Sequence, residues 1–242
     1  RKRDQEPDPF RRNLELEALS EILSRERFIT CHSYVQSEIN MLMHVADSMG
    51  FTLNTFTHVL EGYKVADKLK EHGASASTFS DWWAYKFEVN DAIPYNASIL
   101  VEQGVNTAIN SDDAEMGRRL NQEAAKSIKY GGMSEEDALK MVTINPAKML
   151  HVDHLVGSLT EGKHADFVIW TGHPLSVYSI AENTYIDGVE YFNREKLSEL
   201  EKRDRERRAA IYTRMQEAKN GGAQTRKPSR KMERYYECET ID

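Results

Sequence analysis

Short apolar segments alternate with amphipathic segments along the first half of the chain. The apolar segments cover residues 27–32, 51–58, 74–79 and 105–110. Their β-branched and aromatic side chains are typical of strands buried in a parallel sheet. Each is followed by residues in which apolar side chains recur at helical spacing. The pattern therefore predicts four parallel βα units.

The helix boundaries follow from capping residues and glycines. We predict helices over residues 13–24, 61–72, 95–103 and 115–130, and a further helix that is marked by apolar residues from Ile39 to Ala46 and stops near Gly50. Asn13 suits an N-cap, and Gly50, Gly73 and Gly104 stand where three of the helices end. Residues 1–13 are polar, and we expect an irregular lead-in before the first helix.

Four βα units correspond to half of an eight-stranded barrel, and the alternative is a doubly wound open sheet. No glycine-rich phosphate loop follows any of the strands. Several strands instead end in the same way, on a polar residue. We therefore favour an α/β fold with half of a TIM-type (β/α)₈ barrel within residues 1–150.

The pattern changes after Ser134. A helix with a capping signal starts there, a helical turn follows at residues 145–150, and residues 165–170 form an apolar strand. Asp187-Gly188 predicts a type I′ hairpin turn. We interpret residues 151–193 as part of a small β-sandwich. Residues 194–219 are dense in Glu, Lys and Arg and predict a long solvated helix, followed by a disordered tail to residue 242 that contains Tyr235 and Tyr236.

Composition narrows the class of protein. The chain has 242 residues, of which 40% are hydrophobic and 29% charged, as in a soluble globular protein. A net charge of −7 argues against a nucleic-acid binder. Two cysteines, Cys31 and Cys238, are too few for a disulfide framework. No apolar run approaches the ~20 residues of a membrane span.

The chain begins at Arg1 rather than at a methionine, amid charged and proline-containing residues. We expect it to be a piece of something longer, cut or processed upstream.

Three strand ends carry side chains that bind metals: His32, His58 and Asp112. A single histidine is more often a packed or surface residue than a ligand, and Asp112 could simply cap the next helix. Three such residues at equivalent ends of parallel strands would, however, face one pocket. Imidazole and carboxylate together suit Zn²⁺ or another divalent transition metal.

Several motifs resemble one family. They are ITCHSY at residues 29–34, THVLEG at 57–62, SDWWAYK at 80–86, NSD at 110–112, TINPAK at 143–148, VGSL at 156–159 and GKHADFVI at 162–169. Through these motifs, residues 14–193 resemble the metal-dependent amidohydrolase superfamily, close to its imidazolonepropionase-like branch. The block from 143 to 169 is the most characteristic of them.

The resemblance implies that the four units are barrel strands five to eight. His32 would then be a metal ligand, and His58 a second ligand or a group that polarises the substrate. Asp112 would bind metal and shuttle the proton of the attacking water to the leaving nitrogen. The implied reaction is hydrolysis of an amide, cyclic amide or amidine C–N bond in a small-molecule substrate.

The sequence departs from the family pattern in one large respect. The family's His-x-His element at the end of strand one occurs nowhere in the chain, and strands one to four are absent. We therefore expect the chain to resemble a C-terminal half of the barrel. The missing half would come from the same or a partner chain, and this fragment alone would be inactive. A homo-oligomer is an open possibility.

Other side chains are candidates for the substrate pocket. Trp82, Trp83 and Tyr85 could line its mouth or pack on the adjacent helix. Lys86 and Arg118 could meet a substrate carboxylate.

The remaining chemistry-bearing residues are assigned structural roles. We interpret Cys31 as a packing residue, because strand alternation points it away from His32, and Asp113 as a helix cap. Six histidines are interpreted as structural or surface residues: His44, His72, His151, His154, His164 and His173.

Two other functions remain open. Without the His-x-His element, the chain could be a non-catalytic half-barrel that serves as a scaffold, with its long charged helix packed on a partner. A ring deaminase of the same superfamily uses similar ligands. The compartment is open as well, although relatives with this Trp-Trp loop are often exported.

Overall fold

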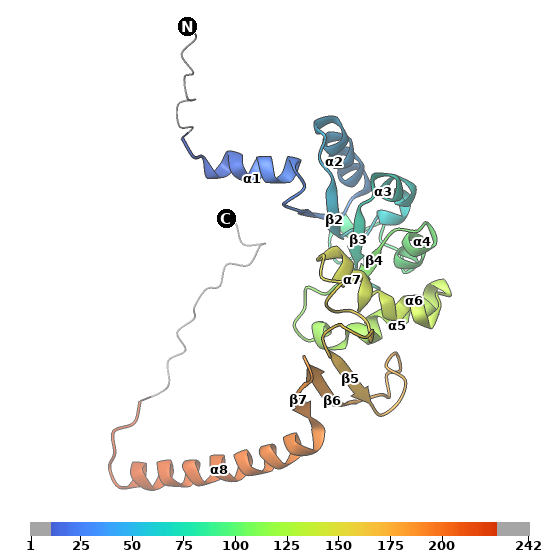
Figure 1. The fold of residues 1–242 in the computed structure, drawn as a ribbon. Coiled ribbons are helices and arrows are strands. Elements are labelled where there is room, and N and C mark those ends of the chain that lie inside the picture. Colours follow the sequence, from blue (N-terminus) through green and yellow to red (C-terminus); the bar gives the residue numbers. More distant parts are fainter. Residues whose placement is uncertain (1–10, 227–242) are drawn as a thin grey trace. The chain divides into compact units, whose positions relative to one another are not determined.

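A computed structural model describes residues 11–226 of the chain. The chain divides into two compact units, Arg1–Phe192 and Asn193–Asp242. The first contains both β-sheets (Figure 1). The expected lead-in at residues 1–10 and the tail at 227–242, with Cys238, Tyr235 and Tyr236, lie outside the described residues.

Four parallel strands form the first sheet. They are β1 (Ile29–Ser33), β2 (Leu53–His58), β3 (Ser75–Thr78) and β4 (Thr107–Ile109). The strands lie in chain order, β1-β2-β3-β4, and each pairs in parallel with the next. A doubly wound sheet reverses its strand order at a switch point, and these four strands contain no such reversal. The predicted parallel βα units are therefore present.

Helices cover one face of this sheet. Figure 1 shows α2 (Gln36–Met49), α3 (Ala66–His72) and α4 (Asn96–Glu102) along the same side of the strands. Side chains of the strands and helices form one buried cluster there, which includes Ile39, Phe56, Leu69 and Leu100. Cys31 packs against this cluster, as predicted. Burial and then the Glu38 carboxylate raise the pKa of its thiol, which keeps it protonated.

The predicted helix ends agree with the structure where they depend on local chemistry. Asn13 caps α1 (Leu14–Leu23) by accepting hydrogen bonds from the amides of Glu15 and Leu16. Gly50 and Gly73 end α2 and α3 with φ of 79° and 85°. Both angles lie in the left-handed region that favours glycine.

Two predicted helices begin later than expected, each after a 3₁₀ turn. The segment predicted as a helix at residues 61–72 starts with Gly62–Lys64 before α3, because Val65 leaves helical geometry at φ −134°. The segment predicted at 115–130 starts with Met116–Arg119 before α5 (Leu120–Gly131), where Arg119 has the same φ. In both segments, the backbone at this residue ends the 3₁₀ turn before the α-helix begins.

The rest of the first unit contains two short helices and a second sheet. Ser134 caps α6 (Glu135–Lys140) by accepting from the Asp137 amide, and α7 spans Ile144–Met149. The sheet has the order β5-β6-β7, with bounds Phe167–Trp170, Ala181–Ile186 and Val189–Asn193. Asp187 and Gly188 both have positive φ, 51° and 77°, which is the predicted type I′ turn.

The second unit is one long helix in its described part. α8 covers Arg194–Asn220, is capped by the Asn193 side chain, and buries none of its residues. The predicted long solvated helix is therefore present. Within residues 11–226, no helix combines the length and the apolar character that a membrane crossing needs.

The burial of Phe56 predicts a measurable loss of stability on truncation. Phe56 is 0% exposed, whereas Phe87 is 91% exposed. Phe56→Ala should lower the free energy of unfolding by about 3–5 kcal/mol, because it removes buried surface and leaves a cavity. Phe87→Ala is the matched control, with an expected effect of about 0.5 kcal/mol or less. Urea denaturation measures both, and equal losses would contradict this description of the core.

Candidate active site

The ends of β1 and β2 bring two histidines into direct contact. His32 Nδ1 lies 2.7 Å from His58 Nε2, and the two rings meet edge to face with centroids 4.5 Å apart. His58 is 2% exposed, whereas His32 is open to solvent. At this distance one ring nitrogen donates a hydrogen bond and the other accepts it.

Asp112 reaches the same histidine from the other side. It follows β4 by three residues, and its Oδ2 lies 3.6 Å from His58 Nδ1. The side chain is 46% exposed, so the carboxylate also meets solvent. His58 thus lies between His32 and Asp112, and the structure brings together the three strand-end residues that the sequence singled out.

Asp113 has a different role. Its Oδ1 accepts hydrogen bonds from the amides of Glu115 and Met116, at 2.9 and 2.8 Å. This is the predicted helix cap. The capping role therefore belongs to Asp113, which leaves the Asp112 carboxylate available to face His58.

The backbone that presents His58 is unusual. His58 has φ 74° and Val59 has φ 41°. Positive φ is uncommon for residues other than glycine and is a genuine outlier for a β-branched residue such as valine. Such conformations cluster at functional sites, where surrounding contacts hold them in place.

Aromatic rings enclose the His58 imidazole. Tyr34 stacks on it with centroids 4.8 Å apart and planes 5° apart, and Phe79 stacks on it at 5.2 Å. Trp82 extends the stack beyond Phe79 at 4.6 Å. Sequence reasoning missed Tyr34 and Phe79. Their signal was an aromatic residue directly after a strand end, but their contact with His58 depends on strand pairing.

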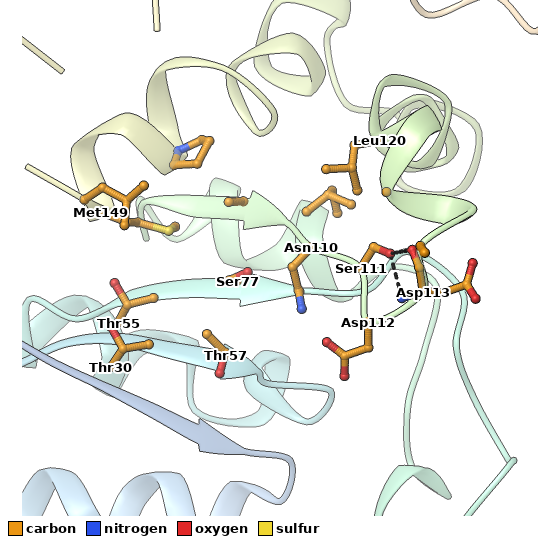
Figure 2. Close-up of a pocket in the computed structure, with 16 residues that line it drawn as sticks. Thr30, Thr55, Thr57, Ser77, Asn110, Ser111, Asp112, Asp113, Leu120 and Met149 are labelled. Atoms are coloured by element: carbon orange, nitrogen blue, oxygen red, sulfur yellow. Dashed lines mark hydrogen bonds between the residues drawn. The ribbon is translucent and has the colours of Figure 1, made fainter. Parts of the chain in front are cut away.

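A cavity of about 620 Å³ opens on the face of the sheet that the helices do not cover. Figure 2 shows its wall: hydroxyl side chains of the strands, the segment from Asn110 to Asp113, and Met149 of α7. The hydroxyl residues are Thr30, Thr55, Thr57 and Ser77. Asn110 Oδ1 is buried and accepts no hydrogen bond among the described residues. The lining is mostly apolar, with a few hydroxyl groups, and it reaches Asp112.

Comparison with known proteins gives the family. The amidohydrolase family profile matches residues 95–202. An imidazolonepropionase of Thermoplasma volcanium is 28% identical over 135 residues, which cover 55% of this chain and 33% of that protein. The crystal structure of an amidohydrolase from Thermotoga maritima matches with a TM-score of 0.70 and 32% identity, over 76% of this chain and 48% of that one.

The chain is similar to members of the amidohydrolase superfamily. Within it, the chain is similar to the imidazolonepropionases. It spans about a third to a half of the length of these relatives. An adenosine deaminase from Xanthomonas campestris, with bound Zn, has a TM-score of 0.56 at 17% identity over 82% of this chain and 54% of that one, which shows a shared fold. The fold is thus of TIM-barrel type.

The aromatic loop after β3 lies beside His58, but its members differ in their contacts. Trp82 is partly buried against the cluster that contains Phe79 and Val89. The ring centroids of Trp83 and of Tyr130 in α5 lie 6.5 Å apart, so Trp83 packs on the adjacent helix, which is one of its two predicted roles. Tyr85 is half exposed.

A buried carboxylate holds this loop on α5. Glu123 is 2% exposed and accepts hydrogen bonds from Ser80 Oγ at 2.6 Å and from Lys126 Nζ at 2.8 Å. Lys126 Nζ also lies 2.9 Å from Asp81 Oδ2. The start of the aromatic loop is therefore tied to the helix by charge-assisted bonds.

The two cationic candidates lie in different surroundings. Lys86 Nζ lies 4.1 Å from the centroid of the Tyr34 ring, the ring that stacks on His58. Arg118 is exposed in the 3₁₀ turn Met116–Arg119. Burial, followed by Tyr34, raises the pKa of the Tyr85 phenol, and Asp112 adds to this rise against the opposing effect of Lys86.

The donor atoms fit a divalent ion, although they do not form a complete site. In the part of the chain that the structure describes, no group of three or more His, Cys, Asp or Glu side chains is placed to hold a metal. Two imidazole ligands at ordinary Zn–N distances lie about 3.3 Å apart, whereas the His32 and His58 nitrogens are 2.7 Å apart. A small widening of the pair, of roughly 0.6 Å, would admit an ion.

The stack on His58 predicts a spectroscopic effect. In Tyr34→Leu the aromatic face beside the imidazole is lost, so the ring-proton signals of His58 should move downfield as the ring-current shielding disappears. Proton NMR of the full chain measures this shift. Tyr130→Leu is the matched control, since Tyr130 contacts Trp83 instead. Unchanged His58 signals in Tyr34→Leu would contradict the stacked geometry.

Proposed function

We propose that this chain is the C-terminal half of an amidohydrolase barrel that hydrolyses C–N bonds in small molecules, such as amides, cyclic amides or amidines. The main observation behind this proposal is that His32, His58 and Asp112 come together where the strands of a parallel sheet end. Similarity to the amidohydrolase superfamily supports the reaction class. The similar proteins include an imidazolonepropionase, a urease subunit alpha and an adenine deaminase, which are enzymes of this kind.

His32 Nδ1 and His58 Nε2 would hold Zn²⁺ or another divalent transition metal, with Asp112 as a further ligand. The two nitrogens already face each other, whereas the half-exposed Asp112 carboxylate lies beside the other ring nitrogen, His58 Nδ1, and would have to move around the ring to join them. When bound, such an ion lowers the pKa of a water molecule toward neutrality.

Asp112 is proposed as the proton shuttle. Its carboxylate combines contact with His58 and access to solvent, so it can take a proton from the attacking water and pass it to the leaving nitrogen. His58 is buried among aromatic rings, and any ring N–H that it directs at the substrate would stabilise a developing oxyanion in a water-poor environment. We keep both roles for His58, as a ligand and as a catalytic group.

The substrate is proposed to bind between the aromatic loop and the strand ends. Trp82 and Tyr85 would supply apolar contact area, while Trp83 lies farther out, against Tyr130. Lys86 is the better candidate for a substrate carboxylate, since it lies over the ring next to His58. Arg118 is the weaker candidate, because it is exposed in the turn before α5.

The other half of the barrel is proposed to come from additional residues in the same or a partner chain. Among the described residues, β1 and β4 each pair with a single strand, so neither edge of the sheet is extended by a further strand. No residue of α1 is buried, and four of its leucines are more than half exposed: Leu14, Leu16, Leu19 and Leu23. Open edges and apolar helix faces are what strands and helices of a closed barrel would cover. Alone, this half would be inactive.

Asp112→Asn tests the catalytic proposal, with Asp113→Asn as a matched control one residue away. In the protein that also contains the other half of the barrel, Asp112→Asn should lower kcat about 10²–10⁴-fold. Asp113→Asn should retain activity, because asparagine caps a helix as well as aspartate does. Turnover is measured on a panel of N-acyl amino acids, dipeptides, cyclic amides and aminated ring bases, and the last group identifies a ring deaminase. Equal activity of Asp112→Asn and wild type would refute the assignment.

A scaffold role is the alternative, and metal content discriminates it. The hydrolase proposal requires a divalent ion in the complete protein, measured by elemental analysis. A fully folded, metal-free assembly would favour the scaffold. The coding sequence upstream of Arg1 offers a second discriminating observation, since a His-x-His element there would favour the enzyme.

A further inference from the structure

The turn that carries His58 needs an external support. His58 and Val59 both have positive φ, and Val59 is fully buried. A β-branched residue does not adopt this conformation by local preference. The contacts around the turn must therefore hold it in place.

Asn96 makes those contacts. It is the first residue of α4 and is 2% exposed. Its Nδ2 donates to the Val59 carbonyl oxygen at 2.8 Å and to Thr78 Oγ1 at 3.0 Å. Its Oδ1 accepts from the Tyr63 amide at 2.8 Å. Both amide hydrogens and the carbonyl oxygen of this buried side chain are thereby satisfied.

These bonds connect the strand ends of the site. The Val59 amide donates to the Ser33 carbonyl, beside His32, at 2.9 Å. The Thr78 carbonyl accepts from the Asn110 amide, two residues before Asp112, at 3.0 Å. Asn96 is thus bonded to residues that pair directly with the strand ends bearing His32 and Asp112.

We propose that Asn96 is a positioning residue, which fixes the strained His58–Val59 turn and thereby holds His58 Nε2 against His32 Nδ1. What His58 does once it is positioned rests on the proposed function. The positioning itself rests on the hydrogen bonds of Asn96 and on the backbone angles of the turn.

Gly62 shows how closely the same turn is packed. A Cβ atom on Gly62 would lie 2.6 Å from Val59 Cγ1 and 3.4 Å from Asn96 Oδ1. The first distance is too short for a real contact, so an added methyl group must displace Val59. The turn is therefore in close contact with both Asn96 and the 3₁₀ turn that contains Gly62.

The test compares Asn96→Ala with Asn145→Ala in the full chain. Asn145 is a matched control, because its Nδ2 also donates to a backbone carbonyl, that of Thr107 at 2.8 Å, but it lies in α7. Three quantities are measured: NMR signals of the His58 imidazole, hydrogen exchange at the Val59 and Tyr63 amides, and the Kd for Zn²⁺ by titration calorimetry.

Asn96→Ala should shift the His58 signals and speed exchange at both amides relative to the rest of the sheet. It should also weaken Zn²⁺ binding about 10–100-fold, as loss of an outer-sphere partner does. Asn145→Ala should leave all three quantities as in wild type. Thr78→Val removes one acceptor of Asn96 at nearly constant volume, so it should produce a smaller change in the same direction even if Asn96→Ala fails to fold.

The outcomes separate this inference from the proposed function. Wild-type His58 signals and Zn²⁺ affinity in Asn96→Ala and Thr78→Val, or equal changes in Asn145→Ala, would overturn the positioning role. If wild type itself binds no Zn²⁺ while the His58 signals respond to Asn96→Ala, the metal-dependent function fails and the positioning role stands.

Discussion

Parallel pairing of neighbouring strands is the constraint on which the site depends. His58 is the last residue of β2 and lies opposite Ser33 of β1 on one side and Thr78 of β3 on the other. Because parallel strands end at the same edge, a histidine on β1, a histidine on β2 and an aspartate after β4 meet without any long connecting segment. The 2.7 Å contact between the two imidazoles is a direct consequence of this register.

The two faces of the sheet have opposite chemistry. One face carries Leu53, Phe56 and Ala76 into a dense apolar cluster under the helices. The other presents threonine and serine hydroxyls to a cavity that reaches Asp112 (Figure 2). The apolar face supplies the burial that stabilises the sheet, so the polar face is free to form a site.

His58 is held in place by contacts with its ring and with its backbone. Its ring stacks between Tyr34 and Phe79, its backbone adopts a conformation unfavourable for the residue, and a hydrogen-bonded asparagine lies behind its turn. Each contact restricts the imidazole in a different direction. A ring restricted in this way loses little freedom when it binds an ion or a substrate, which is the physical advantage of preorganisation.

The sequence by itself determined the features that depend on residues a few positions apart. The caps at Asn13 and Ser134, the glycine helix ends and the Asp187-Gly188 turn belong to this class, and the alternation of apolar segments also indicated the βα units. Only the tertiary structure decided the stack on His58, the bonds of Asn96 and the break at Gly62–Lys64. His32 and His58 are 26 residues apart, and Asn96 and Val59 are 37 apart. Such contacts follow from strand register and helix packing, which local residue patterns do not encode.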